Sequence, residues 1–148
     1  MSSNRVFLMS IRPKYAEAIF SGKKKYELRR LRGPRIPPRS TVIVYSSGDT
    51  RSIVGEFTVH RVIEDSPPSI WNRVSYPGSG ISRDAYNYIR GAKKALALEV
   101  MNPILYRRPV SLDEVRNIIP GWNPPMSYIE LYEDDPLYRL IVEKIRRL

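Results

Sequence analysis

Short apolar runs rich in β-branched residues recur along this chain and are its clearest structural signal. The runs VFLMSI near the N-terminus, TVIVYSS at 41–47 and SIVGEFTVHRVI at 52–63 are typical of strands. Turn residues at 48–50 separate the last two runs and favour a hairpin between them. Within the last run, Gly55 predicts a bulge or a close approach of another backbone.

Three weaker patterns predict further strands. The stretch KKKYELRRL alternates, which places Tyr26 and Leu28 on one face and Lys25, Glu27 and Arg29 on the other. The run KALALEVM predicts a strand that ends at a turn formed by residues 102–103, Asn and Pro. The segment YIEL, near the end of the chain, is interpreted as a short strand or a turn.

Helices are predicted where a start signal precedes apolar residues at helical spacing. Pro13 and Gly22 bound the first helix, and Ser82 and Gly91 bound a later one, while SPPSIWNRV predicts a helical turn between them. The sequence SLDE at 111–114 matches a capping box and predicts a short helix through Ile119. The closing stretch DDPLYRLIVEKIRRL predicts a helix whose apolar stripe comprises Leu137, Leu140, Ile141, Ile145 and Leu148.

The order of these elements predicts the fold class. The chain of 148 residues has the length of one domain, and it contains no internal repeat and no linker long enough to divide it. Strands outnumber helices and do not alternate regularly with them, which favours an α+β fold, a small mixed β-barrel with short helices around its rim, over a doubly wound sheet. We therefore expect a single domain over 1–148, with 132–148 as a C-terminal helical extension.

The charge of the chain indicates a polyanionic partner. Its formal net charge is +10, and arginines outnumber lysines 18 to 7, which suits bidentate contacts with phosphate. Eight basic residues and one acid, Glu27, lie between Lys23 and Arg39. The absence of cysteine and glutamine and the presence of thirteen prolines also fit a protein from a thermophile, so arginine content alone does not decide the function.

Several classes of site and location are disfavoured by composition. Without cysteine the chain lacks disulfides, zinc-cysteine sites, iron-sulfur clusters and thiol nucleophiles. His60 is its one histidine, so we expect no metal, no cofactor and no catalytic triad. Neither a signal peptide nor a membrane-spanning run is evident, and we expect a soluble cytoplasmic protein that does not bind membranes.

One motif in the basic stretch resembles a known family. Gly22, Lys24, Glu27 and Arg29 fit G-x-K-x-x-E-x-R, the hallmark of the ASCH family within the PUA-like superfamily. The preceding stretch LMSIRPKYAEAIFSG and the later GEF and ALALEVMNP strands follow in the family's order, so the resemblance covers roughly residues 5–131. It implies a small β-barrel and a cleft, lined by the motif residues, that binds RNA or a nucleotide-like ligand.

Physical chemistry suggests a role for the acid in this motif. Glu27, between Lys25 and Arg29, would be held ionised by its neighbours, would orient the arginine fork and would accept a hydrogen bond from a base amino group. Alternatively, Glu27 and Arg29 form an ion pair on the strand's surface that contributes little. Lys24 and Arg29 are expected to contact phosphate or base, and the alternative is a solvated basic face.

Other candidates for nucleic-acid contact surround the motif. Arg30, Arg32, Arg35 and Arg39 are expected to add to a general positive field rather than to a defined pocket, and Lys25 is a further candidate for nucleic-acid contact. Tyr76 and Trp122 lie in or beside predicted loops and are the candidates for stacking on bases. Either aromatic ring could instead pack in the core.

These observations favour an RNA-binding module that regulates transcription or translation. An enzyme is the first alternative, because some ASCH relatives resemble amidohydrolases that act on acetylated cytidine with a lysine, a threonine and a glutamate. Lys24 matches that lysine, but Glu27 occupies the threonine position, and Asp84 and Glu64 are unassigned candidates for the carboxylate. The second alternative is an adaptor whose protein partner binds the YIELYEDD region and the C-terminal helix.

Overall fold

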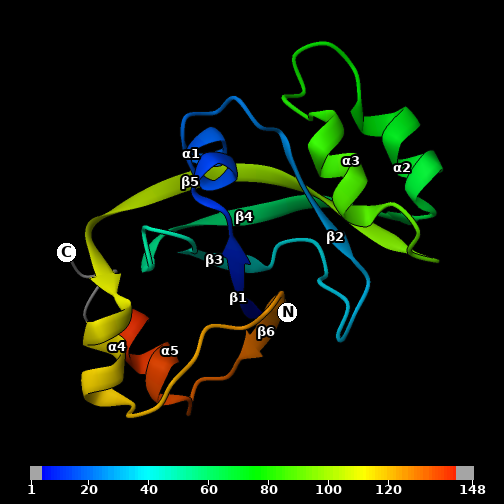
Figure 1. The fold of residues 1–148 in the computed structure, drawn as a ribbon. Coiled ribbons are helices and arrows are strands. Elements are labelled where there is room, and N and C mark those ends of the chain that lie inside the picture. The colour runs from blue at the N-terminus through cyan, green and yellow to red at the C-terminus, as the bar shows by residue number, and fades with distance from the viewer. Residues whose placement is uncertain (1–4, 143–148) are drawn as a thin grey trace.

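The fold is given by a computed structural model that describes residues 5–142 (Figure 1). Its strands are β1 (Val6–Ile11), β2 (Tyr26–Arg30), β3 (Thr41–Ser46), β4 (Ser52–Asp65), β5 (Ala95–Ser111) and β6 (Tyr128–Leu131). Its helices are α1 (Pro13–Phe20), α2 (Pro67–Val74), α3 (Arg83–Ile89), α4 (Leu112–Ile118) and α5 (Pro136–Leu140).

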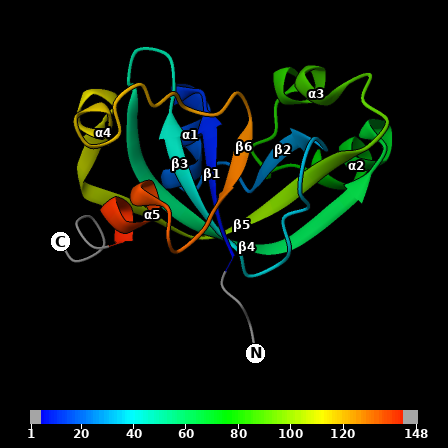
Figure 2. The ribbon, with the colours of Figure 1, turned by 90° about the horizontal axis from the view of Figure 1, so that it is seen from below.

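The strands form one mixed sheet in the order β2-β5-β4-β3-β1-β6. β1 and β3 pair in parallel, and the other neighbours pair antiparallel. The sheet curls into a half-barrel whose edge strands, β2 and β6, face each other across its open side (Figure 2). Short helices lie around its rim, so the predicted α+β class with a small mixed barrel is confirmed.

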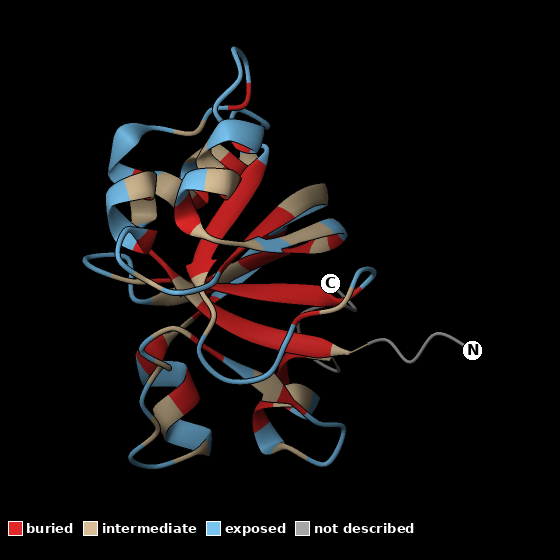
Figure 3. Cartoon of the chain, turned by 90° about the vertical axis from the view of Figure 1, so that its right-hand side faces the viewer, coloured by how far each residue is buried: buried red, intermediate tan, exposed pale blue. Residues whose placement is uncertain are grey.

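Both faces of the central strands are buried, which explains why VFLMSI is apolar without interruption (Figure 3). Phe7, Met9 and Ile11 pack inside the curl with residues of α1, β3, β4 and β5. Val6 and Leu8 point to the opposite face, where they pack with residues of β3, α4 and α5. Each face of β1 therefore has its own hydrophobic cluster.

A third cluster fixes the orientation of β2. Tyr26 and Leu28 pack against residues of α2 and α3, including Ile70 and Ile89. The predicted alternation along β2 is thus confirmed. It also places Glu27 and Arg29 on the opposite face of β2, toward the inside of the curl.

The predicted hairpin and its special glycine are confirmed. β3 pairs antiparallel with β4, and their register shifts beside Gly55. A Cβ atom on Gly55 would lie 2.4 Å from the backbone oxygen of Ile104 and 2.7 Å from the Phe20 ring. Glycine is required there because α1 and β5 approach the β4 backbone closely.

The predicted end of the fifth strand at Asn102 and Pro103 is wrong. β5 continues to Ser111 because the long strand β4 continues to pair with it, from Thr58 opposite Met101 to Ser52 opposite Ser111. Asn102 adopts a positive φ of 49°, and the register shifts at this point. The turn residues are therefore accommodated as a bulge within the strand.

The helices begin and end close to the predicted residues. α1 begins at Pro13, Gly22 adopts a φ of +80° just beyond its end, and Gly91 does the same after α3 with a φ of +88°. Ser111 and Glu114 form the predicted capping box. The helical turn at SPPSIWNRV is α2, and YIEL is the strand β6.

The C-terminal helix packs on its own sheet as far as it is described. Leu137, Leu140 and Ile141 pack against the cluster that contains Val6 and Leu8. The remaining predicted members of the stripe, Ile145 and Leu148, lie outside the described residues. Within residues 5–142, no helix combines the length and the apolar character that a bilayer crossing requires.

Candidate functional site

The turn between α1 and β2 directs Lys24 into the half-barrel. The amide of Lys24 donates to the backbone oxygen of Ala18 at 3.0 Å, which folds the chain back onto α1. The next amide, of Lys25, donates to the oxygen of Ser79 at 2.8 Å, so the loop before α3 supports the turn from the other side. Only 3% of Lys24 is exposed as a result.

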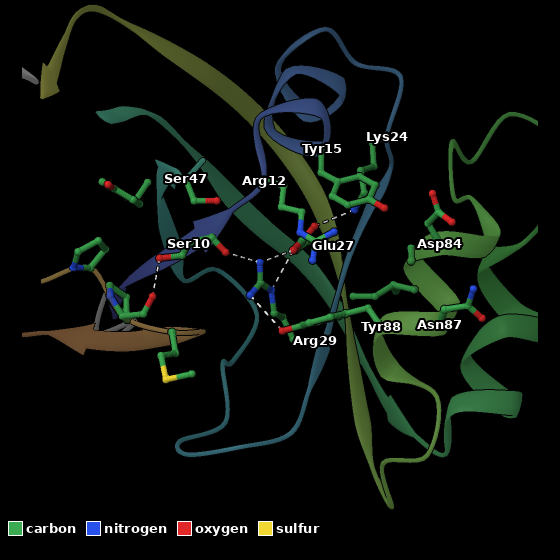
Figure 4. A pocket seen from close by; sticks show the side chains of 16 residues that line it. Ser10, Arg12, Tyr15, Lys24, Glu27, Arg29, Ser47, Asp84, Asn87 and Tyr88 are labelled. Atoms are coloured by element: carbon green, nitrogen blue, oxygen red, sulfur yellow. Dashed lines mark hydrogen bonds and ion pairs between the residues drawn. The ribbon is translucent and has the colours of Figure 1, made fainter. Parts of the chain in front are cut away.

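Lys24, Glu27 and Arg29 form a buried ion network, which we call the Glu27 network. The Glu27 Oε1 atom accepts a hydrogen bond from Lys24 Nζ at 2.8 Å, and Oε2 accepts from Arg29 Nε at 2.9 Å and lies 2.8 Å from Nη2 (Figure 4). Lys24 Nζ also donates to the backbone oxygen of Tyr26, and Arg29 Nη2 donates to that of Ser10 at 2.6 Å. Both cations are therefore held in fixed positions by several acceptors.

Glu27 stays ionised within this network. Burial by itself would raise the pKa of its carboxyl group, but the charges of Lys24 and Arg29 and their hydrogen bonds together outweigh burial and lower the pKa below its ordinary value. A carboxylate accepts about four hydrogen bonds. Glu27 already accepts from both partners, so its main effect is to orient the two cations.

The Glu27 network lines a pocket of about 710 Å³. A pocket of this size is within the range of small-molecule sites. Hydroxyl groups, aromatic rings and a rim arginine surround it, and they come from β1, α1, β3, α3 and the loop before β6 (Figure 4). Besides the network, its walls include Ser10, Arg12, Tyr15, Tyr45, Ser47, Asp84, Asn87, Tyr88, Pro124, Pro125 and Met126.

The prediction that Glu27 pairs with Lys25 was wrong. The carboxylate pairs with Lys24 rather than Lys25, because Lys25 precedes the first residue of β2 and its amine donates to the oxygen of Gly22 at 2.9 Å. The alternative of a surface pair between Glu27 and Arg29 is also wrong. These two residues are paired, but they are only 5% exposed each.

The other basic candidates lie outside the pocket lining. Arg30 donates to the backbone oxygens of Tyr88 and Arg90, at 2.9 and 2.8 Å, and so fastens the end of α3 to β2. Arg35 forms a two-point ion pair with Glu64 at the surface. Arg32 is exposed in the loop after β2.

Neither of the two predicted stacking residues is among the residues that line the pocket. Tyr76 is 46% exposed, but its hydroxyl donates to that of Tyr26 at 3.1 Å. Burial is the main cause that raises the pKa of Tyr26 to about 12. Trp122 packs edge-on against Tyr45, with 6.3 Å between ring centroids, beside the core. The aromatic walls of the pocket are instead Tyr15, Tyr45 and Tyr88.

Sequence reasoning did not identify Arg12, Tyr15, Asn87 and Tyr88 as site residues. They belong to two segments, the stretch around the start of α1 and the helix α3, and none of them is a fixed position of the G-x-K-x-x-E-x-R motif. Only the curl of the sheet and the placement of α3 over β2 bring them to the pocket. Helical spacing within α3 could have grouped Asp84 with Asn87 and Tyr88, but it does not indicate a ligand.

The residues available for amidohydrolase or metal chemistry are limited. The Lys24 amine is engaged with two acceptors, the Tyr26 backbone oxygen and the Glu27 carboxylate, whereas a base or nucleophile requires a free amine. Asp84 lines the pocket, whereas Glu64 is paired with Arg35 elsewhere. Among residues 5–142, no cluster of three or more potential metal ligands is present.

A family profile and a curated relative both match this chain. The profile described as the ASCH domain matches residues 9–101. A relative from Zymomonas mobilis named ASCH domain-containing ribonuclease is 28% identical over 130 residues, which cover 86% of this chain and 85% of that protein.

Solved structures show the same fold. A mutant ZmASCH protein from Zymomonas mobilis superposes with a TM-score of 0.82 at 23% identity and covers 98% of this chain and 99% of that one. The N-terminal domain of Staphylothermus marinus McrB superposes with a TM-score of 0.59 at 18% identity, over 94% and 93% of the two chains. At these identities the likeness concerns the fold alone. The ASCH profile, however, matches well over half of the sequence, and the chain therefore belongs to the ASCH domain family.

Proposed function

We propose that the chain binds single-stranded RNA through the pocket at the Glu27 network, with one nucleotide unit inside. The observation that carries this proposal is the pairing of two buried cations with one buried carboxylate at a pocket of about 710 Å³. Cations held in place without solvent are effective partners for a phosphate group. Tyrosine rings on the same walls offer faces on which a base stacks.

Two further observations support RNA as the ligand. The net charge of +10 would attract a polyanion to the surface before it reaches the pocket. The relative from Zymomonas mobilis is named as a ribonuclease, and this similarity suggests RNA as the class of ligand. Single-stranded segments fit best because their bases are free to leave the stack and enter a pocket.

The first experiment is a titration of labelled single-stranded RNA, structured RNA and DNA at several salt concentrations, followed by fluorescence anisotropy. If three to five phosphates are neutralised, log K falls against log salt with a slope of about −2 to −3.5 for a single strand. A slope near zero would remove nucleic acid from consideration.

A matched pair of variants locates the binding site. Arg12→Gln removes an exposed arginine at the pocket, and Arg107→Gln removes an exposed arginine on β5 outside the pocket lining. Each variant lowers the net charge by one, so the general field changes equally. We expect Arg12→Gln to weaken RNA binding more than Arg107→Gln does. Equal effects would mean that RNA binds the surface field and not the pocket.

RNA cleavage is the second candidate function, and the name of the Zymomonas mobilis relative favours it. An excess of buried positive charge would stabilise the negative charge that develops on a phosphate during cleavage. Incubation of end-labelled single-stranded RNA, with a DNA of the same sequence as control, tests this directly. Fragments from RNA alone, lost in Arg12→Gln, would support cleavage. Regulation of transcription or translation would follow if RNA is bound without being cut, and it stays a prediction.

A further inference from the structure

The guanidinium group of Arg29 uses its N–H donors unequally. Nε and Nη2 lie 2.6 to 2.9 Å from their acceptors, which are the Glu27 carboxylate and the Ser10 backbone oxygen. Among the residues that the structure describes, Nη1 donates to the hydroxyls of Tyr88 and Ser127, both at 3.5 Å. Hydrogen bonds of this type are usually about 2.7–3.2 Å long. The two N–H groups of Nη1 are therefore held weakly and are available to a stronger acceptor.

The surroundings of Nη1 favour an anion as that acceptor. Within residues 5–142, Glu27 is the carboxylate that pairs with Lys24 and with Arg29, so the buried network carries one excess positive charge. A buried charge without a full partner is unfavourable, and a ligand anion would offset it.

Lys24 is less suited to contact the ligand. Its ammonium group has three N–H donors, and it donates to the Tyr26 oxygen and to Glu27. The same nitrogen lies 5.7 Å from the centroid of the Tyr15 ring, which attracts it as a cation. Lys24 thus serves to position Glu27, and Arg29 has the larger remaining donor capacity.

We propose that Nη1 of Arg29 binds one phosphate of the bound nucleic acid and that the adjoining base stacks on the ring of Tyr88. This proposal rests on the proposed function and specifies how the pocket divides one nucleotide. The two N–H groups of Nη1 lie in the plane of the guanidinium, so they present donors in fixed directions to the phosphate oxygens.

Tyr88 is arranged to exchange one partner for another. Its ring lies 5.5 Å from the Arg29 guanidinium carbon, and 42% of the residue is exposed. Its backbone oxygen is fixed by Arg30 Nε at 2.9 Å, so the side chain can turn while the end of α3 stays in place. A phosphate on Nη1 would replace the long hydrogen bond that Nη1 donates to the Tyr88 hydroxyl, and the ring would then face the base.

The test compares three probes on the unmodified protein: adenosine 5′-monophosphate, adenosine and inorganic phosphate, with dissociation constants from NMR titration. We expect the monophosphate to bind at least about tenfold more tightly than either adenosine or phosphate, because it occupies both halves of the site. Equal affinity for adenosine and the monophosphate would overturn the proposal that Arg29 binds the phosphate. Equal affinity for inorganic phosphate and the monophosphate would overturn stacking on Tyr88.

Four variants assign these effects to residues. Tyr88→Leu removes the ring and should weaken monophosphate binding by roughly 5- to 150-fold, whereas Tyr88→Phe keeps the ring and should bind at least as tightly as the unmodified protein. Arg29→Lys should abolish the preference for the monophosphate over adenosine. Arg61→Gln changes an exposed arginine outside the pocket and should change nothing. If Arg29→Lys fails to fold, the two Tyr88 variants still decide the matter: equal affinity in both would overturn the proposal.

Parallel RNA titrations separate this proposal from the proposed function. If RNA binding depends on Arg12 while adenosine and its monophosphate bind equally, Arg29 does not bind the phosphate, but RNA binding in the pocket is still supported. If RNA does not bind but the monophosphate is preferred through Arg29, phosphate binding by Arg29 is supported and the ligand is a free nucleotide.

Discussion

Arg29 in β2 donates a hydrogen bond from Nη2 to the backbone oxygen of Ser10 in β1, at 2.6 Å. β2 is one edge of the sheet, and β1 lies beside the strand at the opposite edge. This side chain therefore connects parts of the sheet that share no backbone ladder. Side-chain contacts of this kind close the open side of the half-barrel, which we call the seam, and the candidate pocket lies at the same place.

A second contact across the seam yields a prediction about stability. The hydroxyl of Tyr128 in β6 donates to the backbone oxygen of Pro34, in the loop after β2, at 2.6 Å. Tyr128→Phe should lower the free energy of unfolding by about 0.5–1.5 kcal/mol, because it removes this one hydrogen bond. Urea denaturation measures the change. Tyr132→Phe, an exposed tyrosine whose hydroxyl lies 3.4 Å from Glu130, is the control and should have almost no effect.

Removal of the charge on Glu27 should destabilise the fold strongly. Glu27→Gln keeps the shape of the side chain but leaves Lys24 and Arg29 buried without a counterion. Loss of one partner of a buried ion pair typically costs about 3–5 kcal/mol. Urea denaturation of this variant should show a far larger loss than Glu99→Gln, in which the partner, Arg61, is exposed. Equal losses in the two variants would mean that the buried network contributes no more to stability than an exposed ion pair.

The same network predicts how stability depends on pH. The pKa of Glu27 in the folded protein lies below its ordinary value of 4.5, so its contribution is fully present above that pH and is lost as the pH falls through the folded pKa. Stability of the unmodified protein and of Glu27→Gln should therefore converge in acid. Other carboxylates with a lowered pKa titrate equally in both proteins. A difference that stays constant from pH 7 to about pH 2 would contradict this assignment.

Local patterns predicted most of the elements correctly because each depends on neighbouring residues. Alternation in β2 separated Tyr26 and Leu28 from Glu27 and Arg29, and the capping box at Ser111 marked the start of α4. The bulge at Asn102 was not predictable in this way. Its turn residues favour a break, and only the pairing of β5 with the long strand β4 overrides that preference.

The site was predictable only in part, for a physical reason. A charged face of a strand usually meets solvent, and the alternation of β2 does not reveal that the sheet curls over that face. Residues of α1 and α3 line the same pocket as Glu27, and Arg12 and Tyr88 reach it only because segments distant in sequence lie close together. Trp122 illustrates the converse, because a loop aromatic that looked accessible packs beside the core.

The loop before α3 provides a test of how Lys24 is positioned. A Cβ atom on Gly80 would lie 2.0 Å from the backbone oxygen of Lys23, whereas one on Gly78 would contact nothing within 4 Å. Both glycines have a positive φ, of +76° and +88°, so alanine at either position is strained by about 1–2 kcal/mol. Gly80→Ala must in addition displace the backbone that carries Lys24.

We therefore expect Gly80→Ala to lose more stability than Gly78→Ala and, unlike it, to weaken RNA binding several-fold. Thermal denaturation gives the first comparison, and RNA titration at a temperature where both variants are folded gives the second. Loss of RNA affinity in Gly80→Ala alone would link the position of Lys24 to binding, because the backbone strain is shared by the two variants. Equal RNA affinity in the two variants, with Gly80→Ala folded, would mean that the loop supports the fold without setting the geometry of the pocket.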